Sequence, residues 1–244
     1  MPDFLDRPGL PRLAYHHRPG AQPTIVFLPG YASDMTGAKA LALDAWAAAC
    51  GQAYLRLDYR GCGESAGVFA EATLDDWRDD ALDLIDTLTE GPLVLVGSSM
   101  GGWLMLLIAL ERPERVQGLV GIAAAPDFTD WGFDDALRAQ IEADGLLARE
   151  SPYDDSVQIF TRPFWASGQA NLLLDAGIMI DCPVRLLHGL DDADVPPSIA
   201  FRLGRALHSG DVQTILLKQG DHRLSRPQDL ALLTTTIGAL IESL

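Results

Sequence analysis

The sequence is poor in basic residues and contains no long apolar run. Both deficits exclude classes of partner and therefore limit the range of possible functions. It has 18 lysines and arginines against 34 aspartates and glutamates, which gives a net charge of −16. Nucleic acid and anionic membrane surfaces require a basic footprint, so neither is expected as a partner, and substrates with several phosphates are disfavoured. No apolar run is long enough to span a bilayer, which argues against stable membrane insertion.

Cysteines and targeting signals are also scarce. The three cysteines, Cys50, Cys62 and Cys182, are odd in number and lack Cys-x-x-Cys spacing. Their usage predicts reduced thiols in a cytosol-like compartment and no zinc site. The first residues show neither the basic flank and apolar core of a signal peptide nor the acid-poor composition of a transit peptide. The expected location is therefore the cytoplasm.

The length and the order of apolar segments predict the fold class. The 244 residues, of which 48% are hydrophobic, fit a single α/β domain over residues 1–244 with room for an insertion. Strand-like and helical patterns alternate, which favours a doubly wound, mostly parallel sheet. The expected strands are 24–28, 53–59, 93–97, 116–125, 184–188 and 212–218, with an irregular lead-in at 1–12 and an edge strand at 13–18.

The connection between the strands at 116–125 and 184–188 is far longer than one crossover helix requires. We expect the excess to form an inserted helical cap over about residues 126–182. The aromatic residues Trp131, Phe133, Phe164 and Trp165 lie in this segment. They are predicted to line an acyl pocket, although aromatic residues in an insertion can also serve only to pack the cap onto the body.

The central feature of the sequence is the apolar run at 93–97. It ends at Gly97-Ser-Ser-Met-Gly101 and is followed by an apolar helical pattern. In a G-x-S-x-G turn between a strand and a helix, the serine hydroxyl stands clear of the sheet edge. The residues two positions either side must lack side chains, and Gly97 and Gly101 meet that need. Ser99 is therefore the predicted nucleophile.

A serine hydroxyl needs a base to take its proton, and the base needs a carboxylate to orient it. Among the five histidines, His222 alone follows the final strand in a loop. His188 ends a strand, where its ring is expected to support a loop, and His208 is expected to cap the carbonyls at a helix end. The chain order serine, acid, histidine then leaves the acid open among the aspartates between 99 and 222. The candidates after strands are Asp127, Asp191, Asp192 and Asp194.

Five segments resemble the α/β-hydrolase superfamily, and in particular its acyl-protein thioesterases and acyl-glucuronide esterases. They read LPGYASDMTGAKALA (28–42), DYRGCGES (58–65), GSSMGGWLML (97–106), RLLHGLDD (185–192) and GDHR (220–223). The resemblance implies an α/β-hydrolase fold with Ser99, Asp192 and His222 as the catalytic triad, because His-Gly-x-x-Asp-x-x-Val-Pro matches at Asp192. Asp127 is the main rival, since some relatives place their acid after the preceding strand.

The resemblance also implies an oxyanion hole built from backbone N–H groups. In this fold one donor is the residue after the nucleophile and the other lies in the loop after an early strand. These residues are Met100 and Tyr31. Many relatives have His-Gly where this chain has Pro29-Gly30, but a backbone donor does not depend on that side chain.

The predicted function is hydrolysis of carboxylic esters or thioesters through an acyl-enzyme on Ser99, without a cofactor or a metal ion. The expected substrate is a small-molecule ester or thioester, or an S-acylated protein. Three alternatives remain on the sequence. They are an acyl-glucuronide esterase, a C–C hydrolase or acyltransferase with the same triad, and a non-catalytic small-molecule receptor, since a fold does not fix a function.

Overall fold

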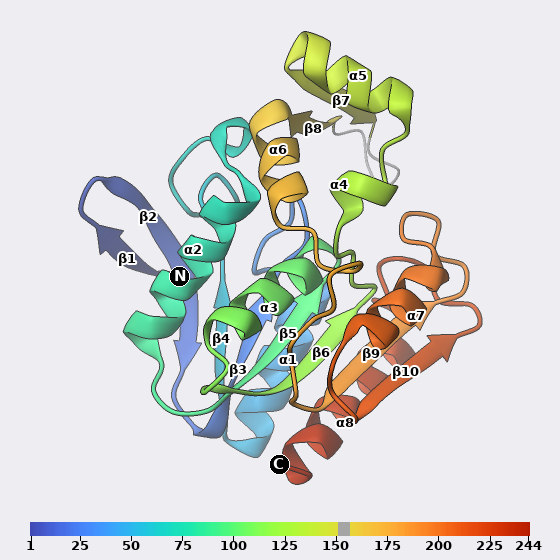
Figure 1. The fold of residues 1–244 in the computed structure, drawn as a ribbon. Coiled ribbons are helices and arrows are strands. Elements are labelled where there is room, and N and C mark those ends of the chain that lie inside the picture. The colour runs from blue at the N-terminus through green and yellow to red at the C-terminus, as the bar shows by residue number, and fades with distance from the viewer. Residues whose placement is uncertain (151–156) are drawn as a thin grey trace.

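The protein is built on an eight-stranded sheet, seen in Figure 1 in a computed structural model that describes residues 1–150 and 157–244. The strand order is β1-β2-β4-β3-β5-β6-β9-β10. Six strands, from β4 to β10 in that order, run parallel, and β1 and β2 are antiparallel additions at one edge. The expected mostly parallel sheet is confirmed. Its strands are β1 (Asp3–Arg7), β2 (Leu10–Arg18), β3 (Ala21–Leu28), β4 (Gln52–Leu57), β5 (Leu93–Ser98), β6 (Val116–Ile122), β9 (Val184–Gly189) and β10 (Val212–Leu217).

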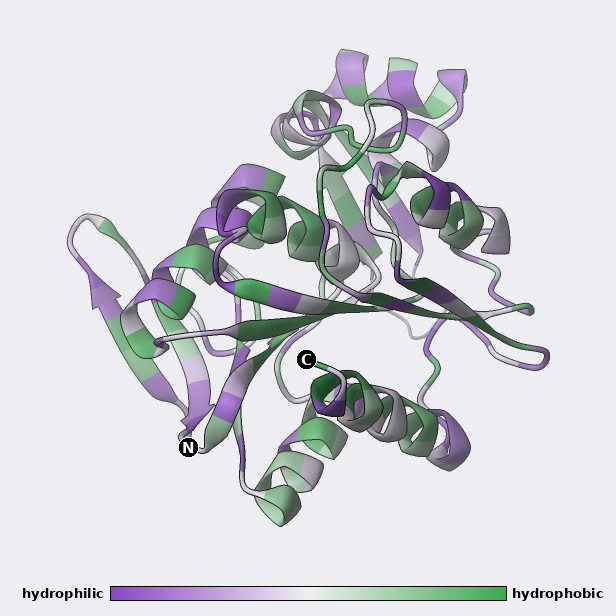
Figure 2. Ribbon diagram, turned by 60° about the horizontal axis from the view of Figure 1, so that its bottom comes forward, coloured by the Kyte–Doolittle hydropathy of each residue, from purple (hydrophilic) through white to green (hydrophobic). Residues whose placement is uncertain are grey.

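Helices cover both faces of this sheet, as Figure 2 shows. One layer consists of α1 (Ala38–Cys50) and α8 (Pro227–Glu242), and the other contains α2 (Leu74–Leu88), α3 (Met100–Glu111) and α7 (Pro197–Ala206). The short 3-10 helix η1 (Phe69–Glu71) precedes α2. Because both faces are covered, the central strands are continuous apolar runs instead of alternating ones. No helix in the described part of the chain has the length and hydropathy needed to cross a membrane.

The N-terminal segment differs from its expectation. Residues 3–18 form a hairpin, with Asp3 opposite Tyr15 and Leu5 opposite Leu13, where an irregular lead-in was expected over residues 1–12. The prolines that suggested irregularity are compatible with this hairpin, because Pro8 lies in its turn and Pro11 lies beside the register shift of the β1–β2 ladder, before the part of β2 that pairs with β4.

Helix α2 begins as its sequence predicts. The Thr73 side chain accepts a hydrogen bond from the Asp76 N–H, and the Asp76 carboxylate accepts from the Thr73 N–H in return. The run of acidic residues over 75–86 resembles a solvated helix face, but Asp80 departs from that pattern. Its side chain is fully buried and forms ion pairs of 2.7 Å with Arg7 and with Arg60.

The cap lies between β6 and β9, above the carboxyl edge of the sheet (Figure 1). Its elements are α4 (Phe128–Trp131), α5 (Asp135–Asp144), β7 (Leu146–Glu150), β8 (Val157–Thr161) and α6 (Arg162–Ala170). The cap contains the expected helices, and in addition β7 and β8 pair as antiparallel strands. Helix α5 ends where Gly145 adopts a left-handed conformation (φ 78°) and closes it.

The buried ion pairs of Asp80 predict a large effect on stability. Replacing Asp80 with Ala should lower the free energy of unfolding by about 3–5 kcal/mol, because two arginines lose their partner inside the protein. The matched control is Asp79→Ala on the same helix, whose exposed ion pair with Arg78 contributes about 0–1 kcal/mol. Urea unfolding of both variants measures the difference, and equal losses would contradict the assignment.

Candidate active site

Ser99 occupies a strained turn between β5 and α3. Its backbone has φ 53° and ψ −120°, a conformation that few side-chain-bearing residues adopt and that is typical of functional sites. The neighbouring glycines permit it. A Cβ atom on Gly97 would lie 2.3 Å from the Gly101 carbonyl oxygen, and one on Gly101 would lie 2.0 Å from the Leu28 carbonyl oxygen. The crossing of strand and helix at this point therefore excludes any larger residue.

Three loops at the carboxyl edge of the sheet bring Ser99, His222 and Asp192 together. The Nε2 atom of His222 lies 3.0 Å from the Ser99 Oγ, and its Nδ1 atom lies 2.9 Å from the Asp192 Oδ2. These are hydrogen-bond distances in the order that a serine nucleophile, a base and an orienting acid require. The catalytic roles of the three residues remain predictions, and the geometry is the one those roles demand.

The Asp192 carboxylate is buried and fully engaged. Its Oδ1 accepts hydrogen bonds from the N–H groups of Asp194 (2.9 Å) and Val195 (2.8 Å). Burial favours the neutral acid, but the hydrogen bonds from His188 and His222 outweigh it and hold the pKa of the Asp192 carboxyl well below its ordinary value. Asp192 is therefore a carboxylate at neutral pH.

The two other histidines considered as bases, His188 and His208, lie away from Ser99. His188 supports the acid loop as expected, because its Nε2 donates to the Val195 carbonyl at 2.9 Å and lies 3.4 Å from the Asp192 Oδ2. The expectation that His208 caps a helix end is wrong. It follows α7 and its Nδ1 lies 2.5 Å from a carboxylate oxygen of Asp181.

Asp127, the rival acid, is used elsewhere. Its carboxylate accepts hydrogen bonds of 2.7–3.0 Å from the N–H groups of Leu173 and Leu174. Burial raises the pKa of the Asp127 carboxyl, and these two hydrogen bonds oppose the shift. Asp127 therefore anchors the segment that leads out of the cap, while His222 is bonded to Asp192.

The predicted oxyanion donors, Met100 and Tyr31, belong to the two segments that adjoin Ser99. Met100 is the first residue of α3, and the first N–H groups of a helix have no acceptor within it. The loop that carries Tyr31 lies against the elbow, since a Cβ on Gly30 would be 3.3 Å from both the Ser98 carbonyl oxygen and the Ser99 Cβ. Pro29 and Gly30 thus occupy the place required of this loop without the histidine common in relatives.

A pocket of about 540 Å³ opens over Ser99 between the cap and the body of the protein. The described residues that line it include Trp131 and Phe133 of the predicted acyl-binding set, but not Phe164 or Trp165. Phe164 is only 1% exposed and its ring packs against Trp77, with 5.5 Å between ring centroids. The Trp165 indole donates to the Thr129 carbonyl at 3.0 Å. For these two residues the alternative of cap packing holds.

Sequence reasoning missed several residues that line the pocket: Lys39, Phe128, Arg149 and Phe160. Phe160 lies on β8, which pairs with β7 in a hairpin that the sequence did not predict. The Arg149 guanidinium lies over the Phe133 ring, 5.2 Å from its centroid, a cation–π contact that spacing alone does not reveal. Of these residues, only Phe128 could have been found from the sequence, because it directly follows the candidate acid Asp127.

Lys39 links α1 to the loop of the predicted base. Its ammonium donates to the Arg223 carbonyl at 2.5 Å, next to His222. Burial, together with the nearby Arg223, lowers the pKa of the Lys39 ammonium to about 8 against the opposing effect of Asp221 and Asp229. The lysine thus fixes the backbone beside His222 at a modest electrostatic cost.

The comparisons with known proteins agree with this geometry. A family model described as "Serine aminopeptidase, S33" matches residues 19–150. The human protein named "Palmitoyl-protein thioesterase ABHD10, mitochondrial" is 42% identical over 245 residues, which cover 99% of this chain and 80% of that protein.

The chain belongs to the α/β-hydrolase family. The structure of mouse alpha/beta hydrolase domain-containing protein 10 has a TM-score of 0.94 and 41% identity, covering 100% of this chain and 99% of the other. A hydrolase from Agrobacterium vitis S4 has a TM-score of 0.90 and 40% identity, covering 99% and 98%. This α/β hydrolase is therefore a serine hydrolase, as the sequence predicted, and the receptor alternative is not supported.

The expected cytoplasmic location of this α/β hydrolase is wrong. Five mammalian relatives that are 41–43% identical to it are all named mitochondrial. Targeting segments are separate from the fold and are removed in the mature protein. The cysteine usage and the first residues, on which the expectation rested, therefore do not determine the compartment.

The two aspartates allow a direct test of the site. Asp192→Asn should lower kcat by about 10⁴-fold, because an amide favours the wrong tautomer of His222. Asp127→Asn should leave kcat nearly unchanged and destabilise the protein by about 1–3 kcal/mol, because it weakens the anchor of Leu173 and Leu174. Steady-state kinetics and urea unfolding separate the two effects. The reverse pattern would make Asp127 the catalytic acid.

The lowered pKa of Lys39 predicts a pH dependence of stability. Its folded pKa of about 8 lies below the ordinary 10.5, so between these values the unfolded chain binds more protons, and the contribution of Lys39 to stability rises with pH. The free energy of unfolding of the wild type should therefore rise relative to Lys39→Met between about pH 7 and pH 10. A constant difference between the two proteins would contradict the shift.

Proposed function

We propose that this α/β hydrolase cleaves acyl thioesters and carboxylic esters through an acyl-enzyme on Ser99. The observation that carries the proposal is the continuous hydrogen-bond chain from Ser99 through His222 to Asp192 at the floor of an aromatic-lined pocket. The names of the mammalian relatives, which are palmitoyl-protein thioesterases, support an acylated substrate.

In the acylation step the Ser99 Oγ attacks the carbonyl carbon while its proton passes to the His222 Nε2. The Asp192 carboxylate stabilises the imidazolium that forms and holds its Nδ1–H in place. Negative charge develops on the carbonyl oxygen, and we assign its stabilisation to the N–H groups of Tyr31 and Met100. His222 then gives the proton to the departing thiolate or alkoxide.

In the deacylation step His222 acts again as the base. It takes a proton from water, the resulting hydroxide attacks the Ser99 ester, and the same oxyanion donors stabilise the second tetrahedral intermediate. The carboxylic acid leaves and Ser99 recovers its proton. No cofactor takes part. Asp192, Asp194 and His222 have ligand atoms within 4.8 Å of one another, but in this mechanism the Asp192–His222 contact is a hydrogen bond, so chelators should not affect the rate.

The chemistry of the pocket favours an acyl chain as the bound part of the substrate. Aromatic side chains from both the cap and the body line it, among them Phe128, Phe133 and Phe160. Burying each methylene of an acyl chain contributes about 0.8 kcal/mol. An S-acylated protein fits this arrangement, with its acyl chain in the pocket and its polypeptide outside.

A second candidate is an ester with an anionic leaving group, of which an acyl-glucuronide is an example. The observation in its favour is that Lys39 and Arg149 line the same pocket although the protein carries a net charge of −16. Cations placed at a site in an acidic protein raise the local affinity for anions.

A hydrolysis panel tests both candidates. Thioesters and aryl esters with acyl chains of two to twelve carbons should show specificity rising with length, by roughly 200-fold for four added carbons until the pocket is full. Ser99→Ala, the control, should lower turnover by about 10⁶-fold without unfolding the protein. A flat length response would reject the acyl pocket, and a preference for glucuronides would favour the second candidate. Activity of Ser99→Ala near the wild-type level would reject the nucleophile.

A further inference from the structure

The side chain of Tyr31 leaves the oxyanion loop and enters the cap. Its hydroxyl donates a hydrogen bond to the carbonyl of Ile159 on β8. Its ring stacks on Phe160 of the same strand, with 4.8 Å between centroids and 17° between the planes. One residue thus carries a backbone N–H next to Ser99 and a side chain fixed to the cap hairpin.

The body of the protein holds the other side of the same loop. The Tyr59 hydroxyl donates to the Pro29 carbonyl at 3.3 Å, and Gly30 lies close to Ser99. The Gly30 carbonyl, which belongs to the same peptide as the Tyr31 N–H, accepts a hydrogen bond from the Ser33 N–H at 3.2 Å, and the loop turns at Ala32, whose φ is 51°. The Tyr31 side chain adds the restraint on this peptide that comes from the cap.

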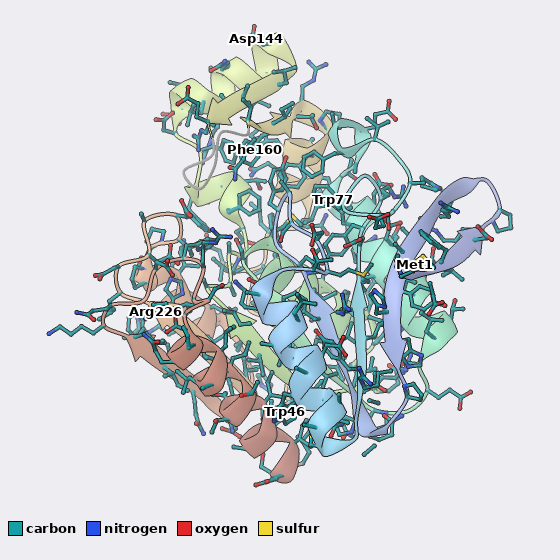
Figure 3. All side chains as sticks on the ribbon, turned by 180° about the vertical axis from the view of Figure 1, so that it is seen from behind. Met1, Trp46, Trp77, Asp144, Phe160 and Arg226 are labelled. Atoms are coloured by element: carbon teal, nitrogen blue, oxygen red, sulfur yellow. The ribbon has the colours of Figure 1, made fainter. Side chains whose placement is uncertain are left out.

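Five aromatic rings pack around that side chain, which also borders the pocket. Ring centroids at 4.8–6.1 Å from that of Tyr31 come from both the cap and the body: Phe69, Trp77, Phe128, Phe160 and Phe164. Figure 3 labels two of them, Phe160 in the cap and Trp77 on α2. Burial raises the pKa of the Tyr31 phenol far above its ordinary value, so the hydroxyl is a permanent donor to the cap.

We infer that Tyr31 is a positioning residue whose side chain lets the cap hairpin set the direction of its own oxyanion-donating N–H. Only two χ angles separate the Tyr31 ring from its backbone, so a shift of β8 that moves the ring also moves the peptide. A misplacement of about 1 Å at a reacting group costs up to about 10²-fold in rate. The inference rests on the proposed function, because it assigns to Tyr31 a part in stabilising the acyl-transfer transition state.

The test uses Tyr31→Phe, which keeps the ring and the backbone N–H and removes only the hydrogen bond to Ile159. The matched control is Tyr54→Phe. Tyr54 is also buried, and its hydroxyl also donates to a backbone carbonyl, that of Ala40 at 2.9 Å, but on the opposite face of the sheet.

We expect kcat for a short aryl ester to fall by about 10- to 100-fold in Tyr31→Phe and to stay within about twofold in Tyr54→Phe, as for a change remote from the site. The inhibition constant of an alkylboronic acid, which mimics the tetrahedral intermediate, should rise by the same factor as kcat falls, because both depend on the oxyanion donors. KM should change little. This parallel change is one that a loss of packing alone would not produce.

Several results would overturn the inference. The first is an unchanged kcat in Tyr31→Phe, the second is a change confined to KM or to the melting temperature, and the third is an equal loss in Tyr54→Phe. Absence of ester and thioester turnover in the wild-type protein would instead reject the proposed function, and the inference with it. A fall in kcat with no change in boronate affinity would place the role of Tyr31 outside the oxyanion hole and also overturns the inference.

Discussion

The site depends on how closely the backbone approaches itself around Ser99. β5, α3 and the end of β3 meet there with no space for a Cβ on Gly97 or Gly101. This closeness forces Ser99 into a left-handed conformation (φ 53°) that projects its hydroxyl from the sheet edge. The strain is affordable because buried strands on both sides and an almost wholly buried helix over-determine the turn.

Two buried carboxylates, those of Asp192 and Asp80, are stabilised by different partners. Asp192 lies inside the protein, where an isolated carboxylate is unfavourable, yet two backbone N–H groups and two imidazoles surround it. Its ionised form is thereby stabilised and can orient His222. Asp80 solves the same problem differently, with two arginines, and serves only the fold. The partners of a buried carboxylate thus determine whether it can orient a catalytic base or only stabilises the fold.

The cap covers the pocket without disturbing this framework. It is inserted between β6 and β9, at the edge of the sheet where both strands point toward Ser99, the usual place for ligand sites in such sheets. Asp127 anchors its exit at Leu173, and Tyr31 contacts it from the oxyanion loop. A change in the cap can therefore alter the pocket and the donors together while β5 and α3 stay fixed.

The sequence by itself determined the sheet, the elbow and the base, because each leaves a local pattern: continuous apolar strands, glycines two residues either side of Ser99, and a histidine after the last strand. Its residue patterns left the acid open among several aspartates, because the partner of His222 depends on which loop folds next to it, and only the family resemblance favoured Asp192. The tertiary structure shows directly that Asp192 contacts His222 while Asp127 anchors the cap. Likewise Phe164 packs and Phe160 lines the pocket, since the facing of an aromatic ring is set by contacts between segments far apart in the chain.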